Sequence, residues 1–221
     1  MNTWHARGRS MSALKLPFSA AQTSFPHPLK TNNLSDAEKI AQIASHMASV
    51  LDILGLDLSN DSLQKTPERI AKMYVQEIFS GLDEKNFPDL SLLDDPAPEE
   101  TGRLITIKNI RFCSFCEHHF VPMIGTADVA YIPNGRIIGL SKINRIVRYF
   151  AKRPQLQERL THQIHDSLKM ILGTDDLAVS IEAKHYCVAI RGIEDDNSST
   201  ATYALSGRLE SDPQLRTEFF K

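Results

Sequence analysis

The chain has few cysteines, no long apolar run and almost no net charge, and each of these absences disfavours a class of protein. Its three cysteines are an odd number, and Cys113 lies close to Cys116, which is a poor basis for a disulfide framework. We therefore expect free thiols and a cytoplasmic protein. There is no run of about eighteen apolar residues, so no membrane span is expected. A net charge of -2 gives no global reason to expect nucleic acid as a partner.

Acidic residues are missing from the N-terminal part of the chain, where none precedes Asp36 while several arginines and lysines do. An acid-free leader can be an organellar transit peptide. However, Pro17, Pro26 and Pro28 interrupt regular structure here, and no amphipathic arginine stripe is evident. We interpret residues 1–34 as a flexible basic N-terminal arm.

The rest of the chain has an ordinary globular composition, with 42% hydrophobic and 24% charged residues among 221. This length allows one main core with a smaller helical appendage. Ser35 and Glu38 form a capping box before a helical apolar pattern. Thr66 followed by Pro67 predicts a second helix with Thr66 as its N-cap. Residues 35–98 are therefore predicted to form an N-terminal helical region.

Beyond an acidic, proline-bearing connector, the pattern changes to β-rich alternation. Strands are predicted over residues 104–112, 121–132, 177–183 and 200–205, and the turn at 133–135 is expected to close a hairpin onto residues 136–140. Two successive helices are predicted between the hairpins, one capped by Ser141 and the next ending at Gly173. The order predicts an α+β domain over residues 99–221, with antiparallel strands.

Thiol and imidazole groups gather in two short segments, Cys116-Glu117-His118-His119 and His185-Tyr186-Cys187. Both groups are favoured ligands of zinc. Residues two apart on an extended strand face the same side, so His185 and Cys187 are expected side by side, whereas Cys116 and His119 need a turn. Two thiolates and one imidazole would leave one position of a tetrahedral ion open, which is the catalytic pattern.

The spacing leaves two other arrangements of these thiols open. Cys113 and Cys116 form a C-x-x-C pair, which could serve redox chemistry or supply half of a closed structural site with His185 and Cys187. A redox pair is expected near the start of a helix in a βαβ unit. Here an apolar strand precedes the pair and two histidines follow it, which favours a metal.

Cationic residues near a predicted helix start could hold a phosphate. Ser141, Lys142 and Arg145 combine backbone N–H groups, the positive end of the helix dipole and two cations. Arg191 follows the strand that leads to Cys187 and could reach the same region. Taken alone, such a cluster is more often an ordinary helix cap with surface charges.

A carboxylate near the start of the next predicted helix could recognise a base. Glu158, beside Gln157, can accept two parallel N–H bonds such as those that guanine presents. Taken alone, an acidic residue at this position more often stabilises the helix dipole. By the same reasoning, Arg69 and Lys72 on the second helix are more often a solvated flank.

Five separated segments resemble GTP cyclohydrolase I in order and spacing. They are TPERIAKMY at 66–74, CEHHF at 116–120, GLSKINR at 139–145, RPQLQERL at 153–160 and HYC at 185–187. The resemblance covers roughly residues 34–221 and leaves out the N-terminal arm. It implies the tunnelling fold, or T-fold, in which helices pack on one face of antiparallel sheets. It also implies a homodecamer with active sites between subunits.

The resemblance further implies that GTP is hydrolysed and rearranged to 7,8-dihydroneopterin triphosphate and formate, the first step toward tetrahydrofolate. By position, the Zn2+ ligands would be Cys116, His119 and Cys187, without Cys113. The proton carriers would be His118 and His185, because imidazoles titrate near working pH.

The remaining positions that match the family would bind the substrate. Guanine would be bound by Gln157 and Glu158; the triphosphate would be bound by Ser141, Lys142, Arg145 and Arg191, with Arg69 and Lys72 added from a neighbouring subunit. Two alternatives are a noncatalytic subunit that kept the fold, and a related T-fold enzyme acting on a reduced pterin or a deazapurine. His118, His185 and Glu158 are all present, which favours the active enzyme, and the triphosphate cluster argues against the second alternative.

Overall fold

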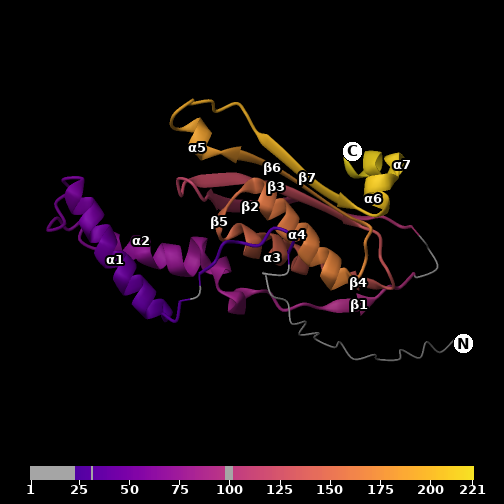
Figure 1. The fold of residues 1–221 in the computed structure, drawn as a ribbon, viewed down its shortest axis with the longest axis horizontal. Helices are drawn as coiled ribbons and strands as arrows, with labels where there is room; N and C mark the ends of the chain where they lie inside the picture. Colours follow the sequence, from indigo (N-terminus) through magenta and orange to yellow (C-terminus); the bar gives the residue numbers. More distant parts are fainter. Residues whose placement is uncertain (1–22, 31, 98–101) are drawn as a thin grey trace, which may run out of the picture.

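A computed structural model describes residues 23–30, 32–97 and 102–221. Most of the expected N-terminal arm, residues 1–22 and 31, therefore lies outside the described residues. The N-terminal helices stand at one end of the molecule, beside a body made of a sheet and two long helices (Figure 1). Within the described residues, every helix is too short or too polar to span a bilayer.

The expected capping box opens the first helix. In α1 (Asp36–Ile53), the Glu38 N–H donates to Ser35 Oγ at 3.3 Å and the Ser35 N–H donates to Glu38 Oε2 at 2.8 Å. α2 (Thr66–Lys72) continues into a π-helical turn, η2 (Met73–Ile78), and then into two short 3-10 turns, η3 (Ser80–Leu82) and η4 (Glu84–Asn86).

The expected N-cap role of Thr66 is wrong, because Lys65 occupies the cap position. The chain already turns before Thr66, whose N–H donates to Leu63 O at 2.9 Å. Thr66 therefore lies inside the first helical turn, where its side chain makes no capping bond.

The central sheet has five strands in the order β5-β2-β3-β6-β7. Their bounds are β2 (Ile105–Cys116), β3 (Pro122–Tyr131), β5 (Pro154–Gln155), β6 (Leu177–His185) and β7 (Thr200–Ser206). All neighbours are antiparallel except β5, which runs parallel to the end of β2. The β2–β3 and β6–β7 hairpins flank α3 (Leu140–Ala151) and α4 (Gln157–Leu172), so the expected α+β arrangement of the T-fold is confirmed.

The main core lies between the sheet and the helices α3 and α4, which cover one face (Figure 1). Both helices contribute fully buried aliphatic side chains on one stripe, and each such side chain stabilises the fold by about 1.5–3 kcal/mol. They include Ile143, Ile146, Val147, Leu160, Ile164 and Leu168. α6 (Arg208–Ser211) and α7 (Pro213–Phe219) form a smaller cluster, in which Leu209 and Phe219 pack with Ala130 and Ala178.

The expected hairpin between β3 and residues 136–140 is wrong. β4 (Arg136–Ile138) instead pairs with β1 (Leu92–Asp94) in a separate two-stranded sheet, with Leu93 opposite Ile137. The reason is that both edges of β3 are already occupied, since Tyr131 pairs with Ile105 on one side and with Leu177 on the other. The turn at 133–135 therefore leads the chain away from the main sheet.

Ser141 does not cap α3 as expected. Gly139 holds the N-cap position, and Ser141 lies in the first turn with no capping hydrogen bond from its side chain. The Lys142 N–H donates to Gly139 O at 2.8 Å, which shows that the helical turn has begun before Ser141. By contrast, α4 ends at Gly173 in the left-handed conformation, as the sequence predicts.

Candidate metal centre and active site

The first half of the site is the turn that joins β2 to β3. Cys116 is the last residue of β2 and is buried. Its N–H donates to Val121 O at 2.9 Å, and its carbonyl accepts from the Phe120 N–H at 2.9 Å. Phe120 has a φ of 53°, in the left-handed region. This tight turn, as the three-residue spacing predicts, brings His118 and His119 back toward the Cys116 sulfur.

The second half of the site is the end of β6. Pairing of β3 with β6 sets Met123 opposite His185, which places this strand end beside the β2–β3 turn. The strand ends at His185, and Cys187 lies in the short helix α5 (Tyr186–Ala189). The expectation that His185 and Cys187 face one side of an extended strand is therefore wrong, although both residues belong to this end of the sheet.

Three of the candidate ligands meet at this point. One ligand atom each from Cys116, His119 and Cys187 lies within 4.8 Å of the other two. The His119 Nδ1 is 4.0 Å from the Cys116 sulfur. Burial, followed by the nearby Cys116 thiol, raises the pKa of Cys187. Two sulfurs and one imidazole match the ligand types of a zinc site with a fourth position left open.

Cys113 does not join this group. The buried positions of β2 alternate through Phe112, Ser114 and Cys116, so Cys113 lies on the opposite face of the strand, where it is exposed. Burial of part of its side chain raises the pKa of the Cys113 thiol. The C-x-x-C spacing therefore does not create a shared pair of ligands.

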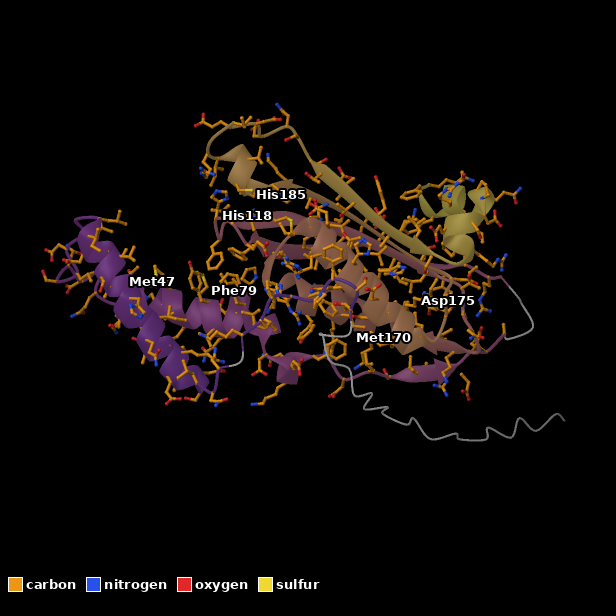
Figure 2. All side chains as sticks on the ribbon, in the orientation of Figure 1. Met47, Phe79, His118, Met170, Asp175 and His185 are labelled. Atoms are coloured by element: carbon orange, nitrogen blue, oxygen red, sulfur yellow. The ribbon has the colours of Figure 1, made fainter. Side chains whose placement is uncertain are left out.

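His118 and His185 lie at the same end of the sheet as the candidate ligands (Figure 2). The His118 Nδ1 is 3.8 Å from the Cys116 sulfur, and its ring centroid is 6.3 Å from that of His119. The His185 Nε2 is 2.7 Å from Gln157 Oε1. Burial lowers the pKa of His185, and the charge of nearby Glu158 opposes this effect.

The first turn of α4 carries Gln157 and Glu158 to the same region. Gln157 is buried, and its Nε2 donates to Ile181 O at 3.1 Å and to Thr200 O at 2.8 Å. Its amide is thus already engaged with β6 and β7 as well as with His185. Glu158 is exposed, so its carboxylate is open to a ligand. The structural role of Gln157 has no local sequence signal, because its partners are distant in the chain.

Among the expected phosphate-binding cations, Arg191 contacts one of the candidate metal ligands within this chain. Arg191 NH1 is 3.0 Å from His119 Nε2. The C-terminal end of α3 leads into β5, which pairs with Phe115 and Cys116. Ser141 and Lys142 lie at its N-terminal end, close to a helix length away, which is about 18 Å for 12 residues, whereas Arg145 lies about halfway along the helix.

The other two expected cations are on α2. Arg69 and Lys72 are exposed, and Lys72 Nζ pairs with Glu68 Oε1 at 2.6 Å. This is an exposed pair one helical turn apart, of the kind that contributes little to stability.

The fold and the site together define a T-fold protein with a cysteine- and histidine-rich candidate metal centre. Comparison with known proteins makes this class specific. A family model described as GTP cyclohydrolase I matches residues 43–221. "GTP cyclohydrolase 1" of Vibrio cholerae is 50% identical over 212 residues, covering 96% of this chain and 97% of that protein. "GTP cyclohydrolase 1" of Aliivibrio fischeri is 53% identical over 192 residues, covering 87% and 88%. The chain belongs to the GTP cyclohydrolase I family.

A solved structure also matches part of the chain. The apo form of the archaeosine synthase QueF-Like aligns with a TM-score of 0.41 and 18% identity, over 49% of this chain and 97% of that one.

Proposed function

We propose that this chain is a zinc-dependent enzyme that converts GTP and water to 7,8-dihydroneopterin triphosphate and formate, the first step toward tetrahydrofolate. Membership of the GTP cyclohydrolase I family supports the reaction. The single observation that carries the site assignment is the meeting of Cys116, His119 and Cys187 within 4.8 Å, at the strand end that also bears His185.

The metal ligands in this proposal are Cys116, His119 and Cys187. A zinc ion held by them would supply Lewis acidity and would lower the pKa of a water in its open position to about 7. The β2–β3 turn and α5 hold these three donors in place. Cys113 has no part in the site, since it lies on the other face of β2.

The proton carriers in this proposal are His118 and His185. Opening of the purine ring requires a proton on N7 of the base and further proton transfers during the rearrangement, and imidazole is the side chain best suited to both. The hydrogen bond with Gln157 fixes the ring of His185, whereas His118 is positioned by the turn that begins at Cys116.

Guanine is recognised by Glu158 in this proposal, with Gln157 beside it. The exposed carboxylate at the start of α4 can accept the ring N–H and the exocyclic amine of guanine together. Gln157 contributes by supporting the base site, because its amide oxygen already bonds His185 and its amide nitrogen bonds the β6–β7 pair.

The triphosphate is bound by cations from more than one copy of the chain. Arg191 lies beside His119, whereas Ser141 and Lys142 lie at the far end of α3 and Arg145 lies about halfway along that helix. Ser141, Lys142 and Arg145 would therefore serve the metal centre of a neighbouring copy, and Arg69 with Lys72 would add charge from another subunit.

We further propose that the chain assembles as a homodecamer with active sites between subunits. The sheet edges left unpaired among the described residues support an assembly, because there β7 has a neighbour on one side and β5 covers only the last two residues of β2. In this assembly residues 99–221 form the catalytic domain and residues 35–98 a helical region preceded by the basic arm. The pairing of β1 with β4 ties these two parts together. Three free thiols support a cytoplasmic location.

Metal analysis combined with incubation on GTP tests this function. We expect about one zinc ion per chain, release of formate, and a fluorescent pterin after oxidation of the product. The variant His118→Ala should lose product formation and keep its zinc, whereas His119→Ala should lose both. A zinc-loaded protein that releases no formate would overturn the reaction, and loss of zinc from His118→Ala would mean that the two adjacent histidines have exchanged roles.

A further inference from the structure

An ion pair with no role in the function proposed so far lies against the candidate metal turn. Glu117 stands between Cys116 and His118, and its Oε2 accepts a hydrogen bond from Arg159 NH1 at 2.5 Å. Only 10% of the Arg159 side chain and 24% of the Glu117 side chain are exposed. Two opposite charges so far removed from water attract each other more strongly than an exposed pair would.

The ion pair joins the metal turn to the start of α4. The Glu117 N–H also donates to Gln155 O at 3.0 Å, so the main chain of Glu117 ties the metal turn to β5, just before α4, and its side chain ties the turn to α4 itself. On the other side, Arg159 directly follows Glu158 in the first turn of α4. The pair therefore connects the turn that would hold the metal to the helix turn whose Glu158 carboxylate would hold the base.

Few other groups could take over the role of Glu117 toward Arg159. The Arg159 Nε is buried and has no hydrogen-bond partner among the described residues. The surrounding side chains include a second buried cation, Arg153, and also His27. Burial, and then the charges of the two arginines, lower the pKa of His27 to about 4. If the Glu117 carboxylate were lost, these neighbours would either repel the positive charge of Arg159 or leave it without a balancing negative charge.

We propose that Glu117 and Arg159 are positioning residues, whose ion pair fixes the metal-binding turn relative to the base-binding carboxylate on α4. This inference rests on the function proposed above. Reacting atoms must approach to about 3–3.5 Å, and a misplacement of about 1 Å can cost about 10²-fold in rate. The pair would thus set the position of the base relative to the metal without touching the substrate.

Kinetics of four variants in the zinc-loaded full chain test the proposal. They are Arg159→Met, Arg159→Lys, Glu117→Gln and the double variant Glu117→Gln with Arg159→Met. We expect Arg159→Met to lower kcat by roughly 10- to 100-fold while KM changes by less than about threefold, because the binding groups remain. Arg159→Lys should keep part of the rate. The double variant should lose less than the two single losses combined, since no unpaired charge remains.

Cobalt substitution gives a readout that does not depend on turnover. In the Co2+-loaded protein, the ligand-field and thiolate charge-transfer bands report the geometry of the metal site. Arg159→Met should change these bands and should weaken zinc binding by roughly tenfold in a chelator competition. If the wild-type protein releases no formate, the proposed function fails, but the cobalt spectra still decide whether the ion pair shapes the turn.

The chain offers a matched control in the ion pair between Asp95 and Arg103. The Arg103 NH2 lies 2.5 Å from Asp95 Oδ1, and the side chains are 28% and 6% exposed respectively, but the pair lies just before β2, at the opposite end of that strand from Cys116. Arg103→Met should leave kcat and the cobalt spectrum unchanged. The proposal is overturned if Arg159→Met keeps the wild-type kcat and spectrum, or if both arginine variants lose activity equally and in proportion to lost thermal stability.

Discussion

Gln157 and His185 form a hydrogen bond whose direction the surrounding structure determines. The Gln157 amide nitrogen faces the carbonyl oxygens of Ile181 and Thr200, at 3.1 and 2.8 Å, and carbonyl oxygens can only accept. The amide oxygen must therefore face His185, whose Nε2 lies 2.7 Å away and has to carry the proton. When the imidazole is neutral, its Nδ1 is left as the proton acceptor.

Replacing Gln157 with leucine should reduce turnover more than binding. The variant keeps the buried volume but removes the group that orients His185, so we expect kcat to fall by about 10- to 100-fold with zinc still bound. The measurement is steady-state kinetics together with metal content. Gln163→Leu is the matched control, because Gln163 is another buried glutamine of α4 whose partners are Phe25 and Gln155. Equal losses in the two variants would contradict a specific role for Gln157.

The helices and strands of the core follow from local sequence, whereas their pairing does not. The one-face pattern of α4 and the alternation of β6 predict both elements to within a few residues. The partner of β4 could not be predicted, because the strand opposite it, β1, lies more than 40 residues earlier, and the turn at 133–135 looks like a local hairpin. Nor does the alternation along β6 mark the change to helix at Tyr186.

The same division holds within the site. The turn between Cys116 and His119 follows from spacing alone, and the family resemblance supplies the choice of Cys187 as the third ligand. The Glu117–Arg159 ion pair joins residues 42 apart, and neither residue has a local signal that names its partner. The remoteness of Ser141 from the metal donors also depends on how α3 runs across the sheet, which periodicity does not reveal.

Gly125 should tolerate no side chain, because β3 and β6 approach closely there. A Cβ on this residue would lie 2.0 Å from Glu182 O and 2.7 Å from the Ala183 Cα. We expect Gly125→Ala to lower the free energy of unfolding by about 3 kcal/mol or more, measured by chemical denaturation, since the backbone of β6 has to shift. Because β6 bears His185, kcat should fall as well. The control Gly135→Ala meets no atom within 4 Å and should cost only about 1 kcal/mol, for its φ of 74°.

Docking of the described N-terminal residues 23–30 should weaken as the pH falls from 6.5 toward 4. Burial, and then the charges of Arg153 and Arg159, lower the pKa of His27 from 6.5 to about 4, while Glu117 opposes the shift. A depressed folded-state pKa means that the neutral ring favours docking. The stabilisation is therefore complete above pH 6.5 and disappears as the pH falls through 4.

Hydrogen exchange can follow this docking at the Ser24 amide, which donates to Asp166 Oδ2 at 2.7 Å. Burial alone would raise the pKa of Asp166, but hydrogen bonds from His165 and Ser24 lower it to about 2, so this acceptor stays charged over the range. In metal-free protein, we expect the protection factor to fall roughly tenfold from pH 7 to pH 5, allowing for the solvent that reaches a half-buried ring. His27→Gln should remove the pH dependence, and its persistence in that variant would assign the effect to another group.

Metal binding should release Arg191 for the substrate. A guanidinium can only donate, so its contact of 3.0 Å with His119 Nε2 requires a lone pair on that nitrogen. If a metal ion binds Nδ1, the proton of the neutral ring moves to Nε2 and the contact is lost. If the ion binds Nε2 instead, it takes the place of Arg191. In either case the arginine leaves His119 and becomes available to a phosphate, which a planar guanidinium binds well.

Zinc should therefore strengthen GTP binding partly through Arg191, and a comparison of variants can isolate that part. The background is His118→Ala, which we expect to bind zinc without turnover. With Arg191 present, zinc should lower the Kd for GTP by roughly tenfold more than it does in the Arg191→Ala version of the same protein, as expected for one charge-assisted hydrogen bond. Any direct attraction between zinc and GTP is common to both proteins and cancels in the comparison. Calorimetric titration of GTP into both proteins, each with and without zinc, measures the difference. An equal effect of zinc with and without Arg191 would show that the contact with His119 does not keep the arginine from GTP.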